Sequence, residues 1–481
     1  MKPTYFLRLT AIMSFALLAA CDGDDGAQGA TGPAGPAGPA GPTGASGTPN
    51  SVTRADVVRT NANIAFANYG DSYLVALDLR DAILEFTANP TAETHQAAKD
   101  AWLASNEPYG QTEVYRFRVG PIDALLPNGQ LGVEGDGPEG KLNAWPLAEA
   151  LIDYVANTVD GDEGPEIPTS QDTVTGNIIS DLSITIDEAT IRGNNELGGD
   201  ERNVTTGYHV VEFLLWGQDL NLDGSGTGTR DATGGQRPFT DYVTGGGCTS
   251  GTGNGSADII CERRADYLEL AVDLLIDDLN SLVEAWNPNG TDNHYCRFTA
   301  SDPSCIEMGM TEAQVIDRSL AIILEGMGRL GFGELAGERM NIALLTNSQE
   351  DEHSCFSDNT HRDIFTNAKG IVNMYTGDYT RIDGEVVSGA GIDDLLLAEG
   401  FAAEENALRA ALEDTMIKVG AIDTVAKGGT PFDNQIQLGI NEPNISGAIR
   451  ALSTQTDFIE DVIGVLGLTT GDLRQDTEED I

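Results

Sequence analysis

Helical periodicity between residue 51 and the C-terminus is the feature that most limits what this chain can fold into. Apolar residues recur there at helical steps, as at Tyr69, Tyr73 and Leu77, and strand-like alternation is scarce. The later segment "RADYLELAVDLLIDDLNSLVEAW" repeats this pattern and is strongly amphipathic. The sequence therefore predicts an all-α protein with about 430 ordered residues.

A segment rich in Gly, Ser and Thr interrupts this periodicity over residues 226–260. Such a composition without apolar spacing is typical of a loop between ordered parts. We therefore expect an N-terminal helical bundle over residues 51–225 and a C-terminal helical bundle over residues 261–481, packed together.

The first twenty residues have the pattern of a secretory signal peptide. The basic "MKPTYFLR" precedes the apolar "LTAIMSFALLAA", which is too short to span a bilayer. The segment ends in "LAAC", which resembles a bacterial lipobox and marks Cys21 as the site of lipidation. An ordinary signal peptide followed by a chance cysteine is the alternative. We expect a lipoprotein of the bacterial cell envelope, periplasmic or facing outward, that meets the membrane through its N-terminal lipid.

A collagen-like repeat occupies residues 21–50. Nine glycines recur at every third position from Gly23 to Gly47, with prolines between them. Three chains could wind into a short triple helix and make the protein a trimer. Alternatively, one chain forms an extended tether. We favour the tether, because nine triplets make a short triple helix and bacteria usually lack hydroxyproline.

The charge of the chain limits its partners. Asp and Glu number 76 against 27 Lys and Arg, a formal net charge of −49. A surface of this kind repels nucleic acid, so we expect no nucleic-acid partner, and it concentrates cations nearby.

Cysteine spacing predicts two disulfides in an exported protein. Cys248 and Cys261 are close in sequence, as are Cys296 and Cys305, and Cys355 is left over. The chain contains no CxxC pair, which argues against a cysteine-bound zinc.

The segment "GYHVVEFLLWGQD" combines the character of a buried helix with a titratable pair. His209 and Glu212 are three residues apart, so a helix places them on one face. This is the reverse order of the Glu-x-x-His element that holds iron in ferritin-like bundles, and iron accepts such mixed ligands. The alternative is a buried pair that is hydrogen-bonded to each other and to the backbone.

Three blocks of the sequence resemble the imelysin-like family, and most closely its iron-regulated protein A branch. They are "LNAWPLAEALIDY", "GGDERNVTTGYHVVEFLLWGQD" and "GERM…EDEHSCFSDNTHRD", and the resemblance extends from residue 51 to about residue 470. The family signature GxHxxE is present as Gly207, His209 and Glu212. The resemblance implies two related domains of the four-helix-bundle type, a polar site near their interface and a link to bacterial iron uptake. The family was first classed as peptidases.

Two ligands do not make a metal site, so we expect others from elsewhere in the chain. Glu113 is the first candidate, because it lies in "YGQTEVYRF", a motif shared with the family. The segment "EDEHSCFSDNTHRD" supplies further candidates, and a helix there would align His353 and His361 on one face. The alternative for any of these residues is a solvated acidic helix face. The candidates in this segment are Glu352, His353, Asp358, His361 and Asp363.

A weaker calcium hypothesis comes from "DLNLDGSGTGTRD". Asp219, Asn221, Asp223 and Gly224 have the spacing of a calcium loop, but the twelfth position, normally a carboxylate, is Arg230. A plain flexible loop is the default interpretation.

Three functional hypotheses follow. The first is a lipoprotein that binds iron or an iron-containing ligand at an interdomain site, working with other envelope iron-uptake proteins. The second is a metallopeptidase that uses zinc on the same residues, although the chain has no HExxH or HxxEH motif. The third is an adhesion or scaffold lipoprotein without a metal site.

Overall fold

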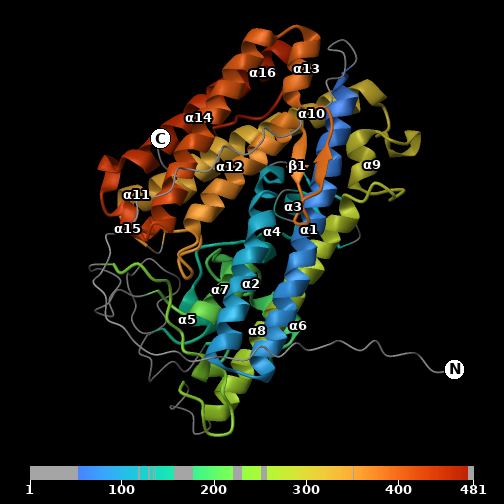
Figure 1. Cartoon of the computed structure of the whole chain (residues 1–481). Helices are drawn as coiled ribbons and strands as arrows, with labels where there is room; N and C mark the ends of the chain where they lie inside the picture. Colours follow the sequence, from blue (N-terminus) through green and yellow to red (C-terminus); the bar gives the residue numbers. More distant parts are fainter. Residues whose placement is uncertain are drawn as a thin grey trace, which may run out of the picture. The chain divides into compact units, whose positions relative to one another are not determined.

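Helices make up nearly all regular structure in the part of the chain that the structure describes, which confirms the predicted all-α class (Figure 1). The computed structural model describes residues 52–474, apart from 118–119, 128–129, 134, 136, 156–176, 220–229, 251–256 and 350. The predicted signal peptide, the lipid anchor at Cys21 and the collagen-like tether lie outside these residues, so they stay predictions.

Within the described ranges, seven long helices carry most of the core. Each of α1, α2 and α10 begins with a Thr cap whose hydroxyl accepts a backbone N–H of the first turn and whose own N–H is bonded in return. The long helices are α1 (Arg54–Ala88), α2 (Ala92–Gly110), α8 (Ala257–Ala285), α10 (Glu312–Arg329), α12 (Thr360–Thr376), α14 (Ala402–Lys427) and α16 (Pro443–Leu466).

Shorter elements connect these helices. A π-helical segment, η6 (Leu330–Ile342), continues α10, and β1 (Asp378–Thr380) pairs antiparallel with β2 (Val386–Ser388). The short α-helices are α3 (Pro121–Ala124), α4 (Glu139–Leu142), α5 (Glu149–Ile152), α6 (Glu188–Asn194), α7 (Tyr208–Trp216), α9 (His294–Thr299), α11 (Ala343–Thr346), α13 (Ile392–Glu399) and α15 (Phe432–Ile436). The 3₁₀ turns are η1 (Glu113–Tyr115), η2 (Leu197–Gly199), η3 (Phe239–Tyr242), η5 (Pro303–Cys305) and η7 (Gly439–Asn441).

The helices pack as two connected groups. Helix α1 packs along α2 and α8, while α14 packs along α16 and α12 (Figure 1). The groups meet where α1 contacts α10 and where α2 contacts α12, and the described residues all fall in one compact unit. The predicted division into bundles at 51–225 and 261–481 stays a prediction. What matters for the site is that α2, α7 and α12 come together.

Both predicted disulfides are present, between Cys248 and Cys261 and between Cys296 and Cys305. Cys355 belongs to neither.

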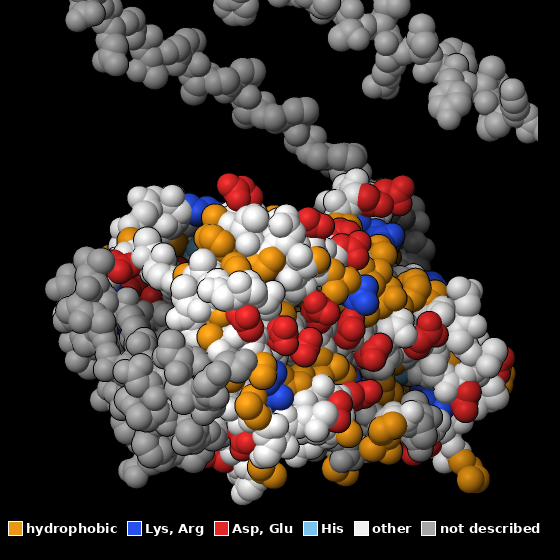
Figure 2. Space-filling view, turned by 90° about the horizontal axis from the view of Figure 1, so that it is seen from below, with side chains coloured by type: hydrophobic (Ala, Val, Ile, Leu, Met, Phe, Trp, Pro, Cys, Tyr) orange, Lys and Arg blue, Asp and Glu red, His pale blue; other side chains and the backbone are white. Residues whose placement is uncertain are grey.

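None of the described helices has the length and apolar character needed to cross a membrane. The face shown in Figure 2 carries many carboxylates and few basic side chains, as the net charge predicts.

Candidate metal-binding site

Helix α7 carries the family signature and is buried along its whole length, as its sequence predicts. It contacts α2 and α8, and its backbone is tied to neighbouring side chains. The indole N–H of Trp102 donates to the carbonyl of Tyr208 at 2.9 Å, and the hydroxyl of Tyr242 donates to that of Leu214 at 2.6 Å. Because these bonds fix the helix in the core, the side chains of its first turn have defined positions.

Gly207 precedes α7 in a conformation that excludes other residues. Its φ of 94° lies in the left-handed region, where a side chain is strained. A Cβ at this position would lie 2.5 Å from the carbonyl oxygen of Leu142 and 2.8 Å from that of Lys141. The glycine of the GxHxxE motif therefore lets the end of α4 pass directly over the start of α7.

The first turn of α7 brings His209 and Glu212 into contact, as the i,i+3 spacing predicts. Nδ1 of His209 lies 2.8 Å from Oε2 of Glu212. The other carboxyl oxygen, Oε1, accepts the backbone N–H of Ser357 at 2.9 Å and its hydroxyl at 2.6 Å. Glu212 is thus held from both sides, by its own helix and by the segment before α12.

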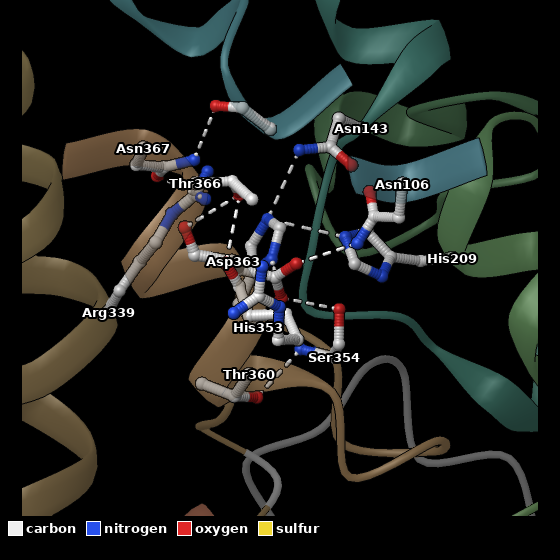
Figure 3. A network of polar contacts seen from close by, with 12 residues as sticks. Asn106, Asn143, His209, Arg339, His353, Ser354, Thr360, Asp363, Thr366 and Asn367 are labelled. Atoms are coloured by element: carbon white, nitrogen blue, oxygen red, sulfur yellow. Dashed lines mark hydrogen bonds and ion pairs between the residues drawn. The ribbon is translucent and has the colours of Figure 1, made fainter. Parts of the chain in front are cut away.

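His353 completes a pair of imidazoles, packed edge to face with their centroids 4.5 Å apart (Figure 3). Its Nε2 lies 3.3 Å from Nε2 of His209, and its Nδ1 lies 2.8 Å from Oδ2 of Asp363. The amide of Asn143 donates to Nε2 of His353 at 3.2 Å. The structure therefore brings together four of the predicted site residues. We call His209 and His353 the histidine pair, and Glu212 and Asp363 its two carboxyl groups.

Asp363 lies on the first turn of α12 and is held by three donors. Oδ1 accepts the amide of Asn106 on α2 at 2.6 Å. Oδ2 accepts the hydroxyl of Ser354 at 2.6 Å in addition to the contact with His353. The side chain of Ser354 and the turn around it thereby fix the ring of His353 (Figure 3).

The number of hydrogens in this chain of contacts identifies its protonation state. The chain Glu212–His209–His353–Asp363 has three contacts, each of which needs one hydrogen, while two neutral imidazoles supply two. Nε2 of His353 accepts from Asn143 and so carries no hydrogen, which leaves Nδ1 of His353 to donate to Asp363. The single lone pair of this Nε2 is then shared between the amide of Asn143 at 3.2 Å and the Nε2–H of His209 at 3.3 Å. Nδ1 of His209 is then an acceptor, and Glu212 carries the third hydrogen.

The pKa shifts agree with this assignment. Burial raises the pKa of Glu212 well above its usual value, and burial lowers the pKa of His209 to about 4. Burial also lowers the pKa of His353, with a further contribution from the cationic Arg339. A neutral pair of imidazoles beside a protonated Glu212 is the state that these shifts favour.

Glu113 lies elsewhere, in a buried network with arginines. Its Oε2 accepts hydrogen bonds from Nη2 of Arg339 at 2.7 Å and from Nη1 of Arg116 at 3.0 Å. Arg339 also donates to Glu334 at 2.7 Å and to Asn367 at 2.7 Å. The predicted role of Glu113 as a direct ligand beside His209 therefore has no support in this geometry, in which the carboxylate balances two guanidinium charges.

The segment before α12 is not helical, which corrects one prediction. Helix α11 ends at Thr346, and Asn347 and Asp358 both adopt left-handed conformations. His353 and His361 consequently do not share a helical face. Nδ1 of His361 contacts the carbonyl of Asp358 at 3.0 Å, and its ring faces Asp423 rather than the histidine pair.

Glu352 lines a small cavity of about 10 Å³ together with His209, His353, Trp145 and Glu149. The side chain of Glu352 is 2 % exposed, and neither carboxyl oxygen has a hydrogen-bond partner within the described part of the chain. Burial raises its pKa well above the usual value, and nearby carboxylates add to the shift. A buried carboxyl without a partner is costly, which makes Glu352 a candidate ligand.

Asp358 belongs to a separate group of carboxyls with Asp219 and Asp433. Burial raises the pKa of Asp219 to about 9 and that of Asp358 to about 8. Asp358 and Asp433 raise the pKa of Asp219 further, and Asp433 raises that of Asp358. Most of the predicted calcium loop, including Asn221, lies outside the described residues, so the calcium hypothesis is not tested.

The candidate ligand atoms are of the types that bind a metal ion, but they do not surround a common point in this structure. Two imidazole nitrogens and a carboxylate are a common ligand set for iron and zinc. Among the described residues, however, no three His, Cys, Asp or Glu side chains are grouped closely enough to hold an ion as they stand. Glu352 would have to turn toward the histidine pair to complete a set of three.

Comparison with known proteins defines the class. The imelysin family model, assigned to peptidase family M75, matches residues 65–459, so the chain belongs to the imelysin family. Among solved structures, the chain is similar to an iron-regulated protein A precursor from Parabacteroides distasonis ATCC 8503, with a TM-score of 0.55 and 17 % identity. The match covers 88 % of this chain and 96 % of that one, and it shows the shared fold. No curated protein matches the chain.

Several residues of the site escaped prediction, although four of them lie in the blocks that carry the family resemblance. Asn143 and Trp145 belong to "LNAWP", and Arg339 belongs to "GERM". Ser354 belongs to "EDEHSCFSDNTHRD". Asn106 carries no local signal, because its role depends on a contact across the fold with Asp363.

Proposed function

We propose that this chain binds an iron ion through Nε2 of His209 and Nε2 of His353 and that it serves iron uptake at the bacterial cell envelope. The observation that carries the proposal is the close approach of the two Nε2 atoms, 3.3 Å apart, with a carboxyl group at each Nδ1. Iron is here the cargo of the protein.

The spacing of the two nitrogens matches that of a shared ion, although one ring would have to turn out of the edge-on packing, with centroids 4.5 Å apart, to aim its lone pair at the ion. Two imidazole nitrogens bound to one ion at about 2.1 Å with a tetrahedral angle lie about 3.4 Å apart. In the metal-free state, the hydrogen on Nε2 of His209 occupies the space between the rings. An ion would replace that hydrogen, and His209 would then donate from Nδ1 to an ionised Glu212.

The carboxyl groups support the ligands from behind. A metal-binding histidine commonly donates its second N–H to a carboxylate, which fixes the ring and raises its basicity. Glu212 serves His209 in this way, and Asp363 serves His353. Glu352 supplies the third donor from the same small cavity. The family and the relative described as iron-regulated favour iron among the metals that accept this ligand set.

The test is metal stoichiometry in matched variants. Protein stripped with a chelator is loaded anaerobically with Fe²⁺, passed over a desalting column and analysed for iron. Wild type and His361→Ala should retain a single ion per chain, while His353→Ala should retain none. His361 is the control because it lies in the same segment but faces Asp423. Equal iron in His353→Ala and wild type would refute the proposal.

A metallopeptidase acting through the same residues is an alternative outcome. That interpretation predicts cleavage of protein substrates that is lost with a chelator and lost in Glu212→Gln. Cleavage that persists in the variant belongs to another protein or another site.

A further inference from the structure

A large acidic cleft adjoins the histidine pair. It has a volume of about 680 Å³ and is lined by sixteen residues, of which seven are Asp or Glu and one is an arginine. The chain as a whole has 76 acidic residues in 481. Carboxylates are therefore concentrated in the cleft well beyond their frequency in an already acidic protein.

The one basic side chain among the described residues of the lining, Arg116, offsets only part of this charge. Arg116 forms ion pairs with Glu113 at 3.0 Å and with Glu139 at 2.9 Å, so its guanidinium is already balanced. The remaining carboxylates of the lining include Glu196, Glu201 and Glu338. A concave surface lined by one sign of charge focuses the potential and raises the local concentration of the opposite ion.

The acidic cleft shares a wall with the small cavity of the histidine pair. Trp145 and Pro146 line both spaces, and the ring of Trp145 lies edge-on to that of His353 at 5.2 Å between centroids. On the inner side of this wall lies Glu352, buried and without a hydrogen-bond partner in the described part of the chain. A cation that passes Trp145 therefore enters a cavity lined by both the imidazoles and an unpaired carboxyl group.

A second cleft near the site has a different character. It has a volume of about 540 Å³, and its lining includes Ser357, the partner of Glu212. Two acidic residues, Glu107 and Asp358, are matched there by two basic ones, Arg362 and Lys427. This second cleft does not select a ligand by the sign of its charge, whereas the acidic cleft does.

We propose that the acidic cleft is the access route to the histidine pair and that it admits iron as a free hydrated cation while it repels anionic ferric chelates. The inference rests on the proposed metal site and adds the chemical class of its ligand. The cleft attracts divalent ions to the wall at Trp145. It excludes complexes in which carboxylate or catecholate ligands give the iron a net negative charge.

The experiment measures metal association by stopped flow. Co²⁺, an air-stable probe, should quench the fluorescence of Trp145 when it binds beside His353. The cleft variant, Glu196→Gln/Glu201→Gln/Glu338→Gln, should associate roughly fivefold more slowly than wild type at 0.1 M salt, with no difference at 1 M salt. Its dissociation rate should not change, because the ligands are intact. Wild type should show no binding of ferric citrate, an anionic chelate.

The matched control removes the same charge from other surfaces. Glu262, Glu385 and Glu413 are exposed and do not line the cleft, so their triple Gln variant should associate within twofold of wild type. If the cleft variant associates as fast as this control, the inference is wrong while the metal site stands. Binding of ferric citrate as tight as that of Co²⁺ would also overturn it. If wild type takes up neither Fe²⁺ nor Co²⁺, the metal site itself is refuted and the inference falls with it.

Discussion

Replacing Glu212 by Gln tests the protonation state assigned to the site. A protonated Glu212 accepts two hydrogen bonds from Ser357 at Oε1 and donates one to Nδ1 of His209. A glutamine reproduces all three, since its carbonyl accepts and its amide donates. We therefore expect Glu212→Gln to fold as stably as wild type in the metal-free state, although it changes a fully buried carboxyl.

The magnitude follows from the contacts. Glu212→Ala loses three hydrogen bonds worth about 1 kcal/mol each and leaves the N–H of Ser357 and Nδ1 of His209 unsatisfied. With the cavity added, we expect a loss of about 4 kcal/mol. For Glu212→Gln we expect a loss below about 1 kcal/mol at pH 5.

The pH dependence has a definite sign. Burial raises the pKa of Glu212 in the folded protein. The folded wild type therefore keeps this proton at pH values above 4.5, the ordinary pKa at which the carboxyl of the unfolded chain loses it. The stability of wild type therefore falls as pH rises through this range, by at most about 1.4 kcal/mol per pH unit from this group. Gln does not titrate, so the free energy of unfolding of Glu212→Gln should rise relative to that of wild type between pH 5 and pH 8.

The assay is urea unfolding of chelator-treated protein, followed by circular dichroism at both pH values. The assignment is refuted if Glu212→Gln is destabilised as much as Glu212→Ala, or if the difference from wild type does not change with pH. Either result would show that Glu212 is ionised in the metal-free site.

Three further predictions concern stability. Asp358→Asn should raise the melting temperature by several degrees at pH 9 and by less at pH 5. The pKa of Asp358 is raised to about 8, so wild type loses stability as pH rises from about 4 to about 8, whereas asparagine does not titrate and accepts the left-handed conformation at this position. An equal increase at both pH values would contradict this. Cys248→Ser/Cys261→Ser should lower the free energy of unfolding by about 3 kcal/mol, measured by urea unfolding without reductant, and no change would show that the bond does not form. Gly207→Ala should lower the free energy of unfolding by about 3 kcal/mol, because of backbone strain and contact with the carbonyl of Leu142. Full stability of the variant in the same assay would refute the geometry of the motif.

The sequence predicts the local part of the fold and of the site. The periodicity identifies the helices because burial of one face sets the spacing of apolar residues. The contact between His209 and Glu212 follows from their separation of three residues on one helix. The disulfides follow from short separations along the chain, 13 and 9 residues.

The long-range part depends on contacts that no local pattern encodes. His353 is 144 residues from His209, and it reaches the site from a non-helical turn rather than from the expected helix. Glu113 is attracted to Arg339, which is 226 residues away, and this ion pair holds it outside the histidine pair. For Glu113, electrostatic pairing across the fold therefore outweighs the motif that made it a candidate ligand.

Anomalous diffraction at the iron absorption edge, from crystals loaded with Fe²⁺ without oxygen, tests the central claim most directly. The account predicts one strong peak about 2.1 Å from Nε2 of His209 and from Nε2 of His353, with the carboxylate of Glu352 turned toward it. A peak at the carboxyl groups of Asp219 and Asp358, or no peak between the two imidazoles, would contradict the proposed iron site.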